Sequence, residues 1–171
     1  EKCETVSNRR AIQAVTGGQL SLGIGLSHEP IIEGSYGYSF EKPLRHMREY
    51  LDALLPLVRD AQVSFAGETV TARIGLDVRG SSPVRVVLAA LGPKMLELAG
   101  GRADGTVTWM TGPATLADHV VPTITAAAAA AGRPAPMIGA GFPVCVTDDV
   151  DAARVNAAQT FAIYATLPSY R

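Results

Sequence analysis

The order of apolar and polar residues divides this chain into short, dense apolar runs and longer amphipathic segments. The densest run, Val84–Ala90, is apolar on both faces, which is typical of a buried parallel strand. The clearest helical pattern begins at Pro43, since proline suits the first turn of a helix. Its apolar residues recur on one face. They are Leu44, Met47, Leu51, Leu54, Leu55 and Val58.

The same patterns predict the remaining elements. Strands are predicted at Gln19–Gly25, Thr106–Met110 and Met137–Val146, and a hairpin at Val63–Thr71. Helices are predicted to end at Thr16 and to cover Pro93–Ala99, Pro113–Ala131 and Val150–Tyr164, with glycines after several of them and a kink at Pro122. The polar segment Leu26–Phe40 is predicted to be a connection, and connections of this length are often binding loops or lids.

Strands and helices therefore alternate along the chain. This alternation indicates an α/β protein with a parallel sheet and right-handed crossovers. It does not choose between an open doubly wound sheet and a barrel.

Composition and charge exclude several classes of protein. The 171 residues are 47% hydrophobic and 18% charged, and 15 basic against 16 acidic residues give a net charge of −1. This balance indicates a soluble globular domain that binds no nucleic acid, and no apolar run is long enough to cross a membrane. Cys3 and Cys145 have neither metal-site nor disulfide-framework spacing, which fits a cytoplasmic protein.

The turn after Val84–Ala90 is the strongest candidate for a binding site. The chain there reads Ala89-Ala90-Leu91-Gly92 and then Pro93, where a helix is predicted to begin. The first N–H groups of a helix lack internal partners and attract anions when no side chain covers them. The turn is thus either a phosphate cradle or a tight strand-to-helix turn that needs small residues for packing. A second small turn, Thr111-Gly112, follows the next strand and favours the anion site.

Other candidate residues have equally plausible structural roles. Gly23 and Gly25 would allow a flat ligand to approach the backbone, or they mark a bulge or a tight bend. His28 is either a polar ligand contact or a surface residue, and Trp109 either walls a pocket or packs in the core.

The histidines within predicted helices, His46 and His119, are expected at the surface. The sequence contains no recognisable nucleophile–histidine–acid set and no metal-binding cluster, so no catalytic residue and no metal ligand is assigned.

Four stretches together resemble the luciferase-like monooxygenase superfamily. They are "GGQLSLGIGLSHEP", "FEKPLRHMREYL", "VLAALGPKMLELAGGRADGTVTWMTGP" and "AAAAAAGRPAP". Within that superfamily the chain is most similar to oxidoreductases that use the deazaflavin coenzyme F420. The similarity covers about Ala11 to Arg171.

The resemblance implies a TIM (β/α)8 barrel with its site at the carboxyl ends of the strands. It also implies roles for particular residues. Ala89, Ala90, Leu91 and Gly92 would hold the cofactor phosphate through backbone N–H groups, with Thr111 and Gly112 beside them. Gly25 and Ser27 would lie near the cofactor ring or its ribityl chain, and His28 in the same neighbourhood.

The chain departs from the family pattern in length. A complete barrel needs roughly 250 residues, and residues 1–171 correspond to about strands four to seven with their helices. The first three strands and the last are missing, including the non-proline cis peptide that the family carries after its third strand. We therefore expect a single incomplete barrel domain that is part of a longer protein.

The function implied for that longer protein is hydride transfer between reduced F420 and a small organic substrate. The alternatives are an FMN-dependent monooxygenase of the same fold, a non-catalytic flavin-binding protein, and an unrelated phosphate-binding module. A homodimer is one way in which an incomplete barrel would cover its open edges.

Overall fold

The computed structural model describes residues 2–78 and 80–170. In chain order the elements are α1 (Lys2–Val15), β1 (Ser21–Ile24), α2 (Glu29–Tyr36), α3 (Pro43–Asp60), β2 (Gln62–Ala66), β3 (Thr71–Gly75), β4 (Arg85–Leu88), α4 (Pro93–Arg102), β5 (Gly105–Trp109), α5 (Pro113–Thr115), a π-helical turn (Leu116–Val120), α6 (Val121–Ala130), β6 (Met137–Gly141), α7 (Val150–Thr160) and two 3-10 turns (Ala162–Thr166 and Pro168–Tyr170).

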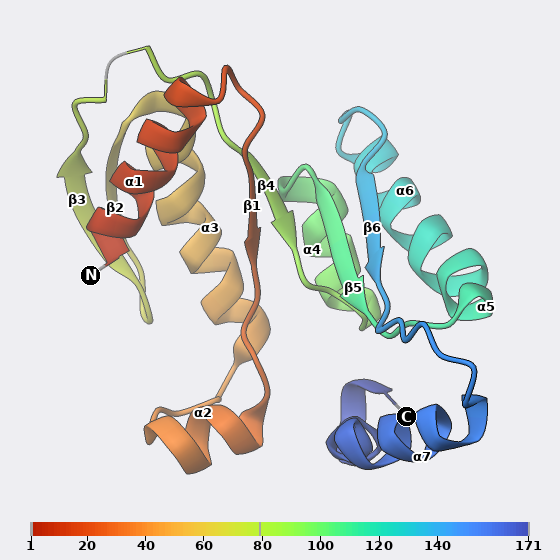
Figure 1. Ribbon diagram of the computed structural model, residues 1–171. Helices are drawn as coiled ribbons and strands as arrows, with labels where there is room; N and C mark the ends of the chain where they lie inside the picture. Colours follow the sequence, from red (N-terminus) through yellow and green to blue (C-terminus); the bar gives the residue numbers. More distant parts are fainter. Residues whose placement is uncertain (1, 79, 171) are drawn as a thin grey trace.

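Four parallel strands form one sheet in the order β1-β4-β5-β6, and β2 pairs with β3 in a separate antiparallel hairpin. Strand order follows chain order, and right-handed crossovers between successive strands place their helices on one face of the sheet. Figure 1 shows α3, α4 and α6 arranged in this way. This sheet is an arc of a (β/α)8 barrel, so the barrel is confirmed over the open doubly wound sheet.

The hydrophobic core lies between the sheet and these helices. Leu51, Leu88, Leu96 and Ile124 are completely buried there. Thr106 on β5 also faces the helices, and its hydroxyl donates a hydrogen bond to the Leu88 carbonyl at 2.7 Å, which satisfies a polar group in an apolar layer.

The opposite face of β5 is open. Val107 and Trp109 alternate with the buried threonines and remain 41% and 39% exposed. In a closed barrel this face points inward.

Two glycines of the "AGGRADG" segment have packing roles. Helix α4 was expected to end at Ala99 but continues to Arg102. Gly100 allows a close crossing with α6, since a Cβ there would lie 2.4 Å from the Ile124 carbonyl oxygen. Gly105 has φ +155°, and a Cβ there would lie 1.9 Å from the Met137 carbonyl oxygen. Glycine at position 105 lets β6 run directly beside β5.

Asp104 joins several segments at the amino end of the sheet. Its carboxylate accepts the Val86 N–H at 2.8 Å and a guanidinium hydrogen bond from Arg133 at 3.0 Å. Arg133 also donates to the Ala103 carbonyl at 2.8 Å, and Arg59 lies 3.8 Å from the Asp104 carboxylate. A cavity of about 560 Å³ opens at this end of the molecule. We call this group of residues the Asp104 clamp.

Two sequence-based predictions of secondary structure were wrong. The segment Leu26–Phe40 contains α2. Glu29 and Pro30 are favourable residues in the first turn of this helix, and Gly37 ends it in a left-handed conformation. The strand predicted at Met137–Val146 ends at Gly141. Pro143 has no N–H to donate, and Val146 is 99% exposed.

The helix predicted at Pro113–Ala131 is continuous but changes its winding. A π-helical turn, Leu116–Val120, separates α5 from α6 just before Pro122. Proline clashes with the carbonyl four residues earlier, and a wider turn at this point relieves that clash. The predicted irregularity at Pro122 is therefore present as a π-turn.

Candidate functional site

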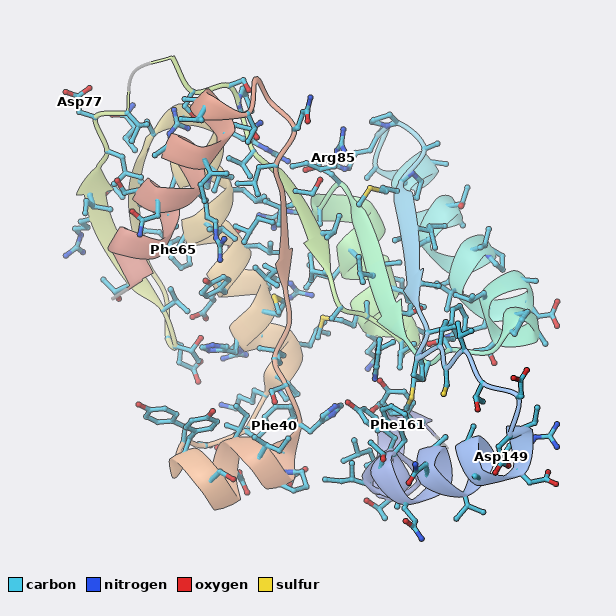
Figure 2. The ribbon with its side chains drawn as sticks, viewed as in Figure 1. Phe40, Phe65, Asp77, Arg85, Asp149 and Phe161 are labelled. Carbon is cyan, nitrogen blue, oxygen red and sulfur yellow. The ribbon has the colours of Figure 1, made fainter. Side chains whose placement is uncertain are left out.

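The carboxyl ends of β1, β4 and β5 form the rim at which a barrel carries its site. Helices α2 and α7 lie beyond these strand ends in Figure 1. In Figure 2, Phe40 and Phe161 lie at this end of the sheet and Arg85 lies at the other.

The turn after β4 places small residues in front of open space. Gly92 is the N-cap of α4, with φ −72° and ψ 149°, a conformation that any residue adopts. A Cβ on Gly92 would meet no atom within 4 Å. Over the described residues, the N–H groups of Leu91 and Gly92 donate no hydrogen bond to other protein groups. Neither packing nor backbone geometry requires glycine here, which argues against the tight-packing interpretation of this turn.

The turn after β5 has the same character. Gly112 has φ −60° and ψ 152°, and a Cβ on it would also meet no atom within 4 Å. Its neighbour Thr111 is buried, with its hydroxyl 3.5 Å from the Trp109 carbonyl. Met110 adopts a left-handed conformation with φ 52°, which is uncommon for a non-glycine residue and is often found at functional sites.

The end of β1 combines a packing constraint with a second left-handed residue. A Cβ on Gly25 would lie 3.0 Å from the Ala89 Cβ, so close strand packing explains this glycine at least in part. Ser27 follows with φ 61°. His28 is the N-cap residue of α2 but caps it with no side-chain hydrogen bond.

Aromatic side chains from the carboxyl-terminal turns reach the same rim. The ring of His28 is 6.4 Å from that of Tyr164 and 6.2 Å from that of Tyr170. Trp109 is 6.5 Å from Phe161, and burial together with the neighbouring Tyr164 raises the pKa of Tyr170. Trp109 thus has an aromatic neighbour and a partly exposed ring. Sequence reasoning missed that Tyr164 and Tyr170 would lie beside His28, because no local pattern determines where these turns fold.

A cavity of about 860 Å³ lies on the helix side of β1. It is lined by apolar and aromatic residues that include Leu26, Tyr38, Phe40 and Tyr50, together with His46 and the ion pair of Lys42 and Glu68. Leu26 continues the core-facing positions of β1, so this cavity is separate from the open face that carries Trp109.

The strongest shift in acidity occurs beside that cavity. The Glu49 carboxylate accepts hydrogen bonds from the Thr69 N–H at 2.6 Å, from the Thr69 hydroxyl at 2.8 Å and from the Val70 N–H at 3.1 Å. These bonds, the Thr69 N–H first, lower the pKa of Glu49 to about 2. Glu49 thereby fastens the β2–β3 turn to α3.

The structure corrects the expectation for His119, which was placed at the surface. Its Nε2 is 2.8 Å from the Leu91 carbonyl oxygen, in the turn after β4. Sequence reasoning missed this contact because it joins residues 28 positions apart.

The described part of the chain holds no cluster of three or more metal-binding side chains, and none of its helices is long and apolar enough to span a bilayer. What the fold and rim define is a βα-barrel with open backbone N–H groups and aromatic rings at its strand ends.

Comparison with known proteins places the chain within that class. A model described as luciferase-like monooxygenase matches residues 11–171, and the chain belongs to this family. The 5,10-methylenetetrahydromethanopterin reductase of Methanolobus tindarius is 27% identical over 159 residues, which cover 93% of this chain and 48% of the relative. The chain thus spans about half the length of the curated relatives it matches.

Solved structures share the fold. An F420-dependent secondary alcohol dehydrogenase in complex with an F420-acetone adduct gives a TM-score of 0.77 at 21% identity, covering 98% of this chain and 52% of that one. A monooxygenase from Streptomyces bottropensis gives 0.70 at 17% identity, covering 92% and 50%.

Proposed function

We propose that this chain forms about four of the eight βα units of an F420-dependent oxidoreductase, corresponding to strands four to seven. The complete barrel transfers a hydride between reduced F420 and a small organic substrate. A relative named as a coenzyme F420-dependent oxidoreductase and structural neighbours described as F420-dependent enzymes support this proposal. A family member that uses FMN is the alternative, supported by the monooxygenase among the neighbours.

The observation that carries the proposal is the open space in front of Gly92 and Gly112. A Cβ at either position would meet no atom of the described protein within 4 Å. A cofactor phosphate in front of these turns gives a reason for glycine that the protein alone does not. The N–H groups of Leu91 and Gly92 are unpaired within the described chain, and the start of α4 adds a partial positive charge.

The remaining rim residues have supporting roles in this proposal. Ala89 is exposed and keeps the approach to the cradle free of a bulky side chain, and Thr111 flanks the cradle. The side chain of Ala90 packs in the core, so Ala90 contributes only through its backbone. Gly25 and Ser27 lie along the cofactor's ring or ribityl chain, with His28 beside them. The deazaflavin, when bound, supplies the hydride chemistry, while the protein orients it and excludes water.

A Gly92→Val substitution in the full-length barrel protein tests this function. The Val side chain would occupy the phosphate position, so we expect F420 binding to weaken at least tenfold while the urea unfolding midpoint changes little. Gly101→Val is the matched control, because Gly101 also borders open space but lies in the last turn of α4. Titrations with F420 and FMN, followed by absorbance, identify the cofactor. Unchanged F420 affinity in Gly92→Val would refute the cradle, and failure of the unmodified protein to bind either compound would refute the function.

A further inference from the structure

His119 belongs to the helix that follows β5, yet it contacts the turn that follows β4. It lies in the π-helical turn Leu116–Val120, and its Nε2 is 2.8 Å from the Leu91 carbonyl oxygen. A carbonyl oxygen can only accept a hydrogen bond, so Nε2 must carry the proton and donate it.

We propose that His119 is a positioning residue for the cofactor phosphate: by holding the Leu91 carbonyl, it directs the Gly92 N–H into the cradle. This inference rests on the proposed function. His119 itself does not touch the phosphate.

Peptide geometry connects the two groups. The Leu91 carbonyl and the Gly92 N–H belong to one planar trans peptide, in which they point in opposite directions. Because His119 fixes the carbonyl on the helix side, the N–H faces the other side. That N–H has no partner among the described protein groups and is free to bind an anion.

The turn needs an external restraint of this kind. Residues 89–92 belong to no helix or strand, and glycine permits a wide range of backbone angles. Rotation of the Leu91–Gly92 peptide would exchange the N–H for the carbonyl, and would turn an anion-binding group into one that repels anions. The His119 hydrogen bond opposes that rotation.

The π-helical turn explains how a residue 28 positions away reaches this carbonyl. Such turns are rare, and they occur frequently at functional sites because they displace one side chain from the regular helical spacing. Here His119 ties the helix after β5 to the turn after β4, and so couples the two turns proposed to flank the phosphate.

The experiment compares two ligands on the full-length protein. F420 carries the phosphate, and its deazaflavin riboside lacks it. We expect His119→Ala to weaken F420 binding about three- to tenfold, the effect of losing one hydrogen bond, and to leave riboside binding unchanged. His119→Gln, whose amide can donate to the carbonyl, should restore most of the affinity, whereas the similarly sized His119→Met should not. His46→Ala is the control for a histidine outside the cradle.

Each result has a distinct meaning. A selective loss of F420 affinity that Gln rescues supports the positioning role. Equal losses of affinity for both ligands would overturn the positioning role, as would equal F420 affinities of the Gln and Met variants. If the alanine variant does not fold, the comparison of the Gln and Met variants still tests the positioning role. If the unmodified protein binds F420 no more tightly than the riboside, the phosphate cradle itself is wrong.

Discussion

The indole ring of Trp109 lies against Gly141, its register partner on the neighbouring strand. A Cβ on Gly141 would be 2.8 Å from Cε3 of Trp109. The same relationship recurs one step earlier, where a Cβ on Gly139 would be 3.3 Å from a methyl group of Val107. On the open face of the sheet, the bulky residues of β5 therefore cover glycines of β6.

We expect Gly141→Ala to destabilise the protein by about 1–3 kcal/mol, because the new methyl group overpacks against a rigid ring. Urea unfolding measures this change. Gly112→Ala is the control at the same rim, since open space surrounds it. In Trp109→Leu the clash should be relieved, so a double-mutant cycle should give a coupling energy well above its error. Additive effects would contradict the contact.

The adjacent glycines of α4 should respond in opposite ways to alanine. Gly100→Ala would place a Cβ 2.4 Å from the Ile124 carbonyl oxygen, and we expect a loss of about 1–3 kcal/mol as α4 and α6 separate. Gly101→Ala meets open space in the last turn of α4 and should stabilise the protein by at most about 0.5–1 kcal/mol. Thermal and urea unfolding of the two variants measure both effects. Equal changes would show that the two helices do not cross closely at Gly100.

The hydrogen bonds to Glu49 should make the β2–β3 turn sensitive to acid. The pKa of Glu49 is lowered from 4.5 to about 2, so the folded state binds this proton less readily than the unfolded state does. Its contribution to stability is complete above about pH 4.5 and is lost as the pH falls toward 2. Glu49→Gln should therefore be less stable than the unmodified protein at neutral pH, and the difference should shrink across that window.

Hydrogen exchange at the N–H groups of Thr69 and Val70, followed as a function of pH, locates this effect. The exposed Glu41→Gln serves as the control. A difference between Glu49→Gln and the unmodified protein that stays constant from pH 6 to pH 2 would contradict the assignment.

Residues 1–171 expressed alone should self-associate or remain loosely packed. Strands β1 and β6 are the edges of the four-stranded sheet, and unpaired edges invite pairing with other chains. Val107 and Trp109 on the open face add exposed apolar surface. Light scattering coupled to size-exclusion chromatography measures the outcome, and a compact dimer would agree with it. A monodisperse monomer with a cooperative melt and tight F420 binding would contradict it.

Local sequence patterns predicted much of the fold correctly. The strands around Val86 and Val107, the helix from Pro43 and the β2–β3 hairpin all appear as expected, because their apolar periodicity and turn residues agree. Two local signals were misleading. The polar, glycine-containing character of Leu26–Phe40 indicated a loop, although Pro30 is favourable in the first turn of α2. Around Val144 and Val146 the apolar alternation indicated a strand, but those residues have no neighbouring strand in the described sheet.

The candidate site was harder to predict because it depends on long-range contacts. The small residues of both turns were visible in the sequence. The sequence did not reveal that packing places no demand for glycine at position 92. It also did not reveal the hydrogen bond from His119, because both depend on how α4, α5 and α6 are placed. The carboxyl-terminal rings near His28 likewise depend on tertiary folding.

The Asp104 clamp has a consequence for how this protein can change over evolutionary time. The carboxylate joins β4, the start of β5 and the loop before β6 at the end of the sheet opposite the rim. Substitutions in the rim turns leave these bonds untouched, so new ligand contacts can accumulate there without loosening the strands. Mutations at Asp104 or Arg133 would instead remove hydrogen bonds that hold the strands together in every such variant. Related chains whose rim turns differ should therefore keep this pair.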